Sequence, residues 1–258
     1  MRKKLDLIRL SQSHLNLLSI CPPRFQQVFL DSLGSLPDPQ QEDSLRWGNR
    51  FHLLMQQKQL GLPITSLLES DSELDRSITA LIDAAPHILS PKEDLWREAE
   101  HCRTLRSGKF LLTVIYDLLV AEKERATIFD WKTYRQPPRR DKLAHDWQNR
   151  LYLYVLAETS DYAPEQIKMI YWFVKSGKPQ SMIFNYSQPQ HQQTEQDLAD
   201  LLINLETWWQ NYQDYEVDFP HRTNCQDNCP YSHLLAEESK DRHQEWIRSI
   251  NEIEEISI

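Results

Sequence analysis

The sequence predicts an α/β protein in which a central mixed β-sheet is flanked by helices. Two apolar runs, Phe110–Val120 and Ala126–Trp131, are rich in β-branched and aromatic residues, and the polar stretch Glu122–Arg125 between them is typical of a turn. Two further runs, Ile167–Val174 and Ser181–Tyr186, also have the character of strands. Segments with helical periodicity precede, separate and follow these strands, and elements in this order pack as a mixed sheet flanked by helices.

The helical segments carry apolar residues at helical spacing, and several end at glycine or proline. They are Ser11–Leu33, interrupted at Pro22–Pro23, and then Asp43–Leu60, Ser70–Ala85, Arg140–Glu158 and Thr194–Tyr212. In the last segment, Trp208 and Trp209 follow the apolar stripe, which favours core packing over stacking on nucleic-acid bases. Leu95–Leu105 is compatible with either a strand or the end of a helix.

Length and composition limit the classes of protein to consider. The chain has 258 residues, 40% of them apolar, which is enough for a large core. Its net charge of −9 argues against a protein that merely coats nucleic acid. No apolar run approaches the roughly 20 residues of a membrane span. The N-terminus lacks a signal-peptide pattern, so we expect a cytoplasmic protein with no membrane partner.

The hairpin brings charged residues together in an unusual way. If its turn is centred between Lys123 and Glu124, Asp117 lies directly opposite Asp130, with Cβ atoms roughly 4.5–5.5 Å apart. Lys132 lies on the same face because side chains alternate along a strand. Two carboxylates and a lysine on one face can hold a hard divalent cation beside a fixed positive charge.

Two other readings of the hairpin stay open. A slip of the register by one residue would place Asp117 and Asp130 on opposite faces of the sheet. Alternatively, Lys132 could pair with one of the aspartates in a purely structural ion cluster, since a buried carboxylate requires a partner.

Five separated motifs resemble those of a known family. They are LSQSHLNLLSICPPRF near the N-terminus, WGNRFH with His52, the isolated Asp117, DWK at Asp130–Lys132, and QNRLY with Gln148 and Tyr152. In this order they resemble the PD-(D/E)XK nuclease superfamily, in the RecB-like branch that includes CRISPR-associated and recombination exonucleases. The resemblance extends from Ser11 to about Leu235 and implies a restriction-endonuclease-like core.

The resemblance also implies roles for the residues of these motifs. His52, Asp117, Asp130 and the carbonyl of Trp131 would ligate Mg²⁺ or Mn²⁺. Lys132 would act on the attacking water or on the charge of the transition state. Gln148 would contact the substrate, and Tyr152 lies on the same helix face as Gln148.

The expected function is a metal-dependent DNA nuclease, in particular an exonuclease that hydrolyses phosphodiester bonds in single-stranded DNA or DNA with ends. The resemblance implies a helicase or a CRISPR or repair protein as a candidate partner, and because the chain has no P-loop motif, DNA unwinding would have to come from another chain. We predict one nuclease-like domain over residues 1–235, with a helical part over about 1–90 and a catalytic core over about 95–215. Residues 236–258 are expected to form a charged helix or tail.

The cysteines match the family only in part. Members of this branch bind a [4Fe–4S] cluster through one N-terminal and three C-terminal cysteines, and here Cys21, Cys225 and Cys229 match three of the four positions. Leu235 stands where the last cysteine is expected, with Cys102 and His233 as substitutes. We interpret this set as a degenerate iron–sulfur site.

One further departure, Val114 in place of the family's glycine before Asp117, motivates a second hypothesis. Together with the acidic charge and the missing cysteine, it favours a catalytically weak or inactive nuclease fold that serves DNA binding or complex assembly. A third hypothesis is a structural interaction protein in which Asp117 and Asp130 share no site. Glu98 and Glu100 precede the hairpin, and one of them is a candidate for an additional acidic ligand.

Overall fold

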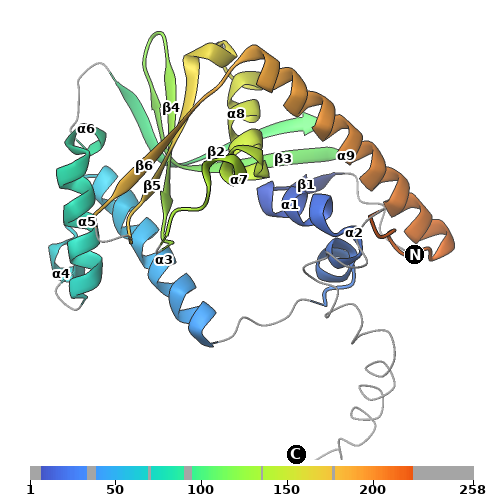
Figure 1. The fold of residues 1–258 in the computed structure, drawn as a ribbon, viewed down its shortest axis with the longest axis horizontal. Coiled ribbons are helices and arrows are strands. Elements are labelled where there is room, and N and C mark those ends of the chain that lie inside the picture. The colour runs from blue at the N-terminus through green and yellow to red at the C-terminus, as the bar shows by residue number, and fades with distance from the viewer. Residues whose placement is uncertain are drawn as a thin grey trace, which may run out of the picture. The chain divides into compact units, whose positions relative to one another are not determined.

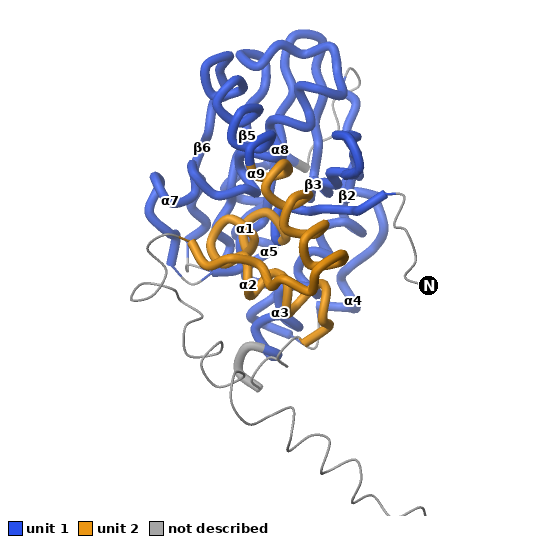
Figure 2. The backbone as a smooth tube through the Cα atoms, turned by 90° about the vertical axis from the view of Figure 1, so that its right-hand side faces the viewer, with its two compact units in different colours: residues 1–13, 36–200 blue, residues 14–35, 201–258 orange. Residues whose placement is uncertain are grey.

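The computed structural model describes residues 7–33, 39–68, 71–89, 95–134, 136–175 and 178–222 (Figure 1). The chain divides into two compact units, which Figure 2 colours separately. The first unit comprises residues 1–13 and 36–200, and the second comprises residues 14–35 and 201–258. The charged helix or tail predicted for residues 236–258 lies outside the described residues.

The first unit contains a six-stranded mixed sheet, which confirms the predicted fold class (Figure 1). Its strands are β1 (Ile8–Leu10), β2 (Trp96–Ser107), β3 (Phe110–Ala121), β4 (Ala126–Lys132), β5 (Ile167–Phe173) and β6 (Gln180–Asn185). The strand order is β1-β3-β4-β5-β6, with β2 paired to β3. The β1–β3 and β4–β5 pairs are parallel and the other pairs are antiparallel. The ambiguous segment Leu95–Leu105 is therefore a strand, and the short strand β1 is an element that the sequence reading did not anticipate.

The register of the β3–β4 hairpin agrees with the predicted turn centre. Leu118 pairs with Phe129, and Ala121 pairs with Ala126. Because β2 pairs with one edge of β3 from Trp96 to Ser107, except at Glu100, β1 and β4 share the other edge of β3, and the β1 pairs end at Leu112. The stretch of β3 that ends at Asp117 therefore has no ladder partner on this edge among the described strands. The sheet opens at the position of the predicted site.

Helices cover both faces of the sheet. On one face, α3 (Pro39–Gln59) and α5 (Ser72–Ala84), with the short α4 (Thr65–Leu68) and α6 (Pro86–Leu89), enclose an apolar cluster that includes Phe51, Leu54, Leu74, Leu118 and Trp172. Helix α8 (Trp147–Glu158) packs on β2, β3 and β5. No residue of α8 belongs to that cluster, so α8 covers the opposite face.

The single helix predicted over Arg140–Glu158 is wrong. The segment forms α7 (Arg140–His145) and α8, separated at Asp146, whose backbone is extended. The Asp146 side chain accepts a hydrogen bond from the backbone N–H of Gln148 at 2.8 Å. Aspartate at an N-cap satisfies an orphan amide of the new helix, which explains why the chain starts a second helix here.

The second unit joins segments from both ends of the chain. It holds most of α1 (Gln12–Ile20), α2 (Pro22–Phe25), a π-helix over Gln26–Leu30, and the end of α9 (Gln188–Tyr215). The predicted break at Pro22–Pro23 is confirmed, because α2 starts there. The rings of Phe25 and Phe219 stack 6.2 Å apart, and Gln26 Oε1 accepts a hydrogen bond from the Phe219 amide at 2.7 Å.

Trp208 also packs against Phe219, with ring centroids 5.8 Å apart, in agreement with a role in packing. Within the described part of the chain, no helix combines the length and apolar character of a membrane span.

Candidate metal centre

A break in the β2–β3 ladder places two carboxylates beside each other. In the β2–β3 ladder, Ala99 pairs with Leu118 and His101 pairs with Tyr116, so Glu100 and Asp117 face each other without forming a ladder pair. Glu100 has a φ of 53°, in the left-handed region that glutamate rarely adopts. Such a residue costs on the order of 1 kcal/mol and persists where the surroundings enforce it.

The same break interrupts the alternation of side chains along β3. Leu118 belongs to the apolar cluster beneath α3 and α5, whereas the Tyr116 hydroxyl donates a hydrogen bond to the backbone carbonyl of Tyr152 on α8 at 3.0 Å. In a regular strand, Leu118 and Tyr116 would point to the same face. The irregularity between them allows Asp117 to point into the opening at the edge of β3.

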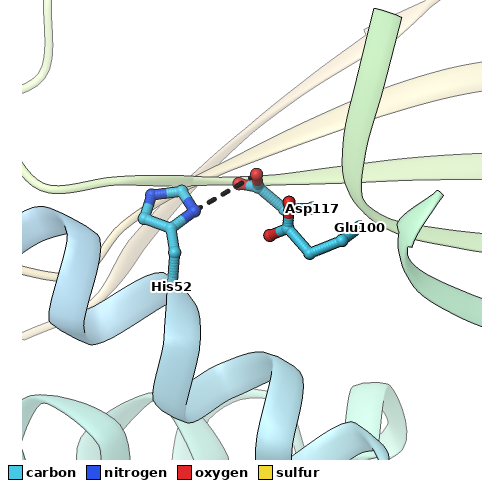
Figure 3. A group of neighbouring side chains, drawn as sticks. All are labelled: His52, Glu100 and Asp117. Atoms are coloured by element: carbon cyan, nitrogen blue, oxygen red, sulfur yellow. Dashed lines mark ion pairs between the residues drawn. The ribbon is translucent and has the colours of Figure 1, made fainter. Parts of the chain in front are cut away.

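Three side chains from three elements converge at this opening (Figure 3). His52 projects from α3, Glu100 from β2 and Asp117 from β3, and one ligand atom from each lies within 4.8 Å of the others. His52 Nδ1 lies 3.2 Å from Asp117 Oδ1. One imidazole nitrogen and two carboxylates suit Mn²⁺ or Mg²⁺, so the donor set fits the predicted metal.

Gly48, one turn before His52 in the WGNRFH motif, explains how α3 comes so near the sheet. A Cβ atom at Gly48 would lie 3.1 Å from Thr133 Oγ1, just beyond the end of β4. Such a contact is tighter than most, so a side chain at position 48 would require Thr133 to shift by a few tenths of an ångström. Glycine at position 48 therefore accommodates the close approach of α3 to the end of β4.

A second group lies beside the first and consists of Asp130, Lys132 and Gln148. Lys132 Nζ lies 2.7 Å from Asp130 Oδ2 and donates a hydrogen bond to Gln148 Oε1 at 2.6 Å. Gln148 Nε2 donates to Asp130 Oδ1 at 2.6 Å, which closes a ring of three side chains. Asp130 and Lys132 are buried, and the cap at Asp146 fixes Gln148 in the first turn of α8.

Residues Trp131 and Tyr152 hold the two groups in place. The backbone N–H of Trp131 donates to Asp117 Oδ2 at 2.6 Å, while its indole lies in the apolar cluster. The Tyr152 hydroxyl hydrogen-bonds the Gln148 side chain and the backbone of Ile115. Asp117 thus touches both the ligand cluster and the strand that carries Asp130 and Lys132.

The site carries an excess of negative charge, which is reflected in the pKa values of its residues. Burial acts to lower the pKa of His52, but the hydrogen bond to Asp117 and the charges of Asp117, Asp130 and Glu100 outweigh it and raise this pKa. Burial, followed by the charge of Asp117, raises the pKa of Glu100. Burial raises the pKa of Asp130 to about 6, although the Lys132 ammonium opposes the shift. A bound cation would relieve this repulsion.

Lys132 keeps its charge in this setting. Burial acts to lower the pKa of Lys132, but the carboxylate of Asp130 outweighs burial, with smaller effects from Tyr134 and Asp117, and raises it. The lysine is therefore an ammonium at neutral pH rather than a base.

The structure distinguishes the two glutamates that the sequence analysis left open. Glu98 Oε2 lies 2.8 Å from His101 Nδ1, outside the ligand cluster, whereas Glu100 belongs to it. The signal for Glu100 was present in the sequence, since a two-residue turn at Gly108–Lys109 fixes the β2–β3 register and places Glu100 opposite Asp117.

The other predicted residues are not brought into this site. Cys21 is fully buried at the start of α2 in the second unit, and Cys102 is exposed on β2. Cys225 and Cys229 lie outside the described residues, so the degenerate iron–sulfur site stays a prediction. Val114 is fully buried within β3.

Comparison with known proteins agrees with this architecture. A crystal structure of a protein from Eubacterium rectale named "Putative exonuclease" superposes with a TM-score of 0.53 at 11% identity, covering 89% of this chain and 88% of that chain. The structure of SSO0001 is more distant, with a TM-score of 0.36 at 13% identity over 79% of this chain and 78% of that chain. No curated protein matches the sequence. The sequence profile of the PD-(D/E)XK nuclease superfamily matches residues 9–234. The chain therefore belongs to the PD-(D/E)XK nuclease superfamily.

Proposed function

We propose that this chain is a divalent-metal-dependent deoxyribonuclease that hydrolyses phosphodiester bonds. The observation that carries the proposal is the convergence of His52, Glu100 and Asp117 within 4.8 Å of one another, directly beside the buried Asp130–Lys132 pair. Membership of the nuclease superfamily supports DNA as the substrate class.

His52, Glu100 and Asp117 would hold the metal, with Asp130 beside them as a further oxygen donor. Mg²⁺ and Mn²⁺ both accept carboxylate oxygen, and the imidazole of His52 favours Mn²⁺. When bound, the ion would supply positive charge against the negative charge that develops on the phosphate. The hydrogen bond from the Trp131 amide fixes one oxygen of Asp117 and thereby leaves the other to face His52.

Lys132 would act as a fixed cation. Its ammonium is held by Asp130 and Gln148 at 2.7 and 2.6 Å, so little reorganisation is needed to present the third N–H to a phosphate oxygen or to the attacking water. Tyr152 would serve as a positioning residue that keeps the amide of Gln148 in this orientation.

Within the nuclease class, exonucleolytic cleavage of single-stranded DNA or DNA ends is the activity that the motif resemblance and the name of the E. rectale neighbour favour. A covalently closed single-stranded circle separates the two modes of cleavage. An exonuclease degrades an end-labelled linear strand in Mn²⁺ and leaves the circle intact, whereas an endonuclease cuts both.

The proposal is tested by incubating purified protein with end-labelled DNA and Mn²⁺ or Mg²⁺. We expect Asp117→Ala and Lys132→Ala to lose at least about 100-fold in single-turnover rate, the scale of losses when transition-state charge stabilisation is removed. Asp83→Ala serves as a matched control because Asp83 is exposed on α5, away from both groups. Equal cleavage by the wild type and both site variants would contradict the proposal.

The same experiment addresses the alternative of an inactive nuclease fold used for DNA binding or complex assembly. That alternative predicts no turnover at any metal concentration, together with DNA binding that is unaffected by Asp130→Ala. Gel-shift measurements on the variants used for cleavage provide this comparison.

A further inference from the structure

A polar cavity of about 380 Å³ lies between α3 and β2, next to the metal-ligand cluster. Its volume falls in the lower part of the range of small-molecule sites, about 300–1,000 Å³. Two glutamine side chains, Gln56 and Gln59, line it from α3, and Glu98 and Glu100 line it from β2. Arg97 also lines it, and Leu60, Ala99 and Leu118 provide its apolar lining.

The cavity and the metal-ligand cluster are adjacent, because Glu100 belongs to both. Gln56 follows His52 by one helical turn, and residues four apart lie on the same face of a helix. Figure 3 shows His52 on this face of α3, with Glu100 pointing toward it from the sheet.

The lining has unused hydrogen-bonding groups. Gln59 Oε1 is buried and has no hydrogen-bond partner among the described residues, and Gln59 Nε2 reaches only the backbone carbonyl of Ile88, at 3.5 Å. The side chain of Gln56 makes no hydrogen bond within the described part of the chain. A buried acceptor without a donor is costly, so Gln59 Oε1 is available to a donor group of a ligand in the cavity.

The charge of the lining restricts the ligand. The two carboxylates of Glu98 and Glu100 outnumber the one cation of the described lining, Arg97, whose guanidinium donates to the Ile88 carbonyl at 3.1 Å. The net negative charge disfavours a phosphate, whereas the carboxylates accept hydrogen bonds from amino groups. The amides of Gln56 and Gln59 can donate to and accept from the edge of a flat heterocycle, as glutamine does with adenine. Leu60, which is exposed, offers an apolar surface for the ring.

We propose that this cavity is a nucleobase subsite that takes the base next to the scissile phosphate and prefers bases with an exocyclic amino group over thymine. The inference rests on the proposed function, because a phosphate at the metal-ligand cluster is what places the neighbouring base at the cavity. The carboxylates accept from the amino group, and the two glutamines engage the remaining edge of the base.

The test uses single-stranded oligonucleotides that carry adenine, cytosine, thymine or an abasic site at one position beside the scissile phosphate, on either side of it. Single-turnover cleavage in Mn²⁺ is measured for each. For wild-type protein we expect adenine and cytosine to be cleaved about 5–10-fold faster than thymine or the abasic site at one of the two flanking positions, the effect of one or two neutral hydrogen bonds.

The double variant Gln56→Ala/Gln59→Ala is expected to cleave the adenine, cytosine and thymine substrates at nearly equal rates, so that the ratio of adenine to thymine cleavage is near one. It should still cleave the abasic substrate at the wild-type rate. Gln57→Ala is the matched control, because Gln57 lies between these residues on α3 and does not line the cavity. A second variant, Ala99→Leu, narrows the cavity from β2 without removing a polar group and should reduce the ratio in the same way.

The outcomes separate this inference from the proposed function. Equal cleavage of all substrates by wild-type protein would overturn the subsite and leave the nuclease proposal intact. Retention of full base discrimination by both cavity variants would also overturn the subsite. Failure of wild-type protein to cleave any substrate would overturn both proposals.

Discussion

Replacing Glu100 by glutamine tests the repulsion between the carboxylates of Glu100 and Asp117 in the candidate metal centre. The two carboxylates offer oxygens no more than 4.8 Å apart. Two unit charges at this distance repel by about 3 kcal/mol at an effective dielectric constant of about 20. Because Glu100 is only half-buried, solvent screening reduces the figure to about 1–2 kcal/mol. Glutamine keeps the size and backbone conformation of the residue and removes only the charge.

The variant should therefore change stability in opposite directions without and with metal. In EDTA we expect Glu100→Gln to raise the Tm by about 2–8 °C, since 1 kcal/mol corresponds to about 2–4 °C in a chain of this size. At a Mn²⁺ concentration of 100 times the wild-type Kd, metal binding raises the free energy of unfolding of the wild type by about 2.7 kcal/mol. If the variant binds Mn²⁺ ten times more weakly, the same Mn²⁺ concentration raises its free energy of unfolding by only about 1.4 kcal/mol.

Differential scanning calorimetry in EDTA and in Mn²⁺ measures both effects, and Glu98→Gln is the matched control. Glu98 lies on the same strand, but its carboxylate pairs with His101 and is not in the ligand cluster. The reasoning is refuted if Glu100→Gln lowers the Tm in EDTA, or if Mn²⁺ stabilises it as much as it stabilises the wild type.

Three further predictions concern the buried residues beside the cluster. Gln148→Ala removes two hydrogen bonds to charged groups, so we expect the free energy of unfolding to fall by about 3 kcal/mol in urea titrations; a loss below about 1 kcal/mol would show that the ring of three side chains is not stabilising. Tyr171→Phe should raise the same free energy by about 1 kcal/mol, since the buried hydroxyl has no partner among the described residues; a loss of stability would contradict this. In EDTA, the raised pKa values of Asp130 (about 6) and His52 make the folded state bind more protons, so stability should fall as the pH rises from about 4 to 7. Asp130→Asn should reduce that fall by on the order of 2 kcal/mol, and identical pH profiles in chemical denaturation would show that Asp130 does not contribute.

The hairpin register was predicted from local chemistry, with a slip by one residue left open. The polar run Glu122–Arg125 favours a short turn, and a turn centred between Lys123 and Glu124 gives the pairing that the structure has. The helix break at Asp146 was not foreseen, because the apolar stripe of Arg140–Glu158 continues across it. An N-cap aspartate can start a new helix within an unbroken stripe, and periodicity alone does not detect it.

The partners of Asp117 and Asp130 in the site could not be predicted from strand alternation. Regular alternation predicts that Asp117 and Asp130 share a face as equivalent ligands. The structure instead associates Asp117 with His52 and Glu100, and Asp130 with Lys132 and Gln148. The cause is the irregularity at Glu100, whose positive φ interrupts the ladder. A glutamate in the left-handed region is held there by tertiary packing, and no sequence propensity indicates it.

By itself, the sequence determined the mixed α/β fold and the order of the motifs that carry His52, Asp117, Lys132 and Gln148, and it indicated the hairpin register once the turn centre was assumed. These follow from periodicity, turn chemistry and residue type, which are local properties. Only the tertiary structure decided that Glu100 joins the ligand cluster and that a polar cavity adjoins it. Both depend on where α3 lies against β2 and β3, and that placement results from packing between segments far apart in the chain.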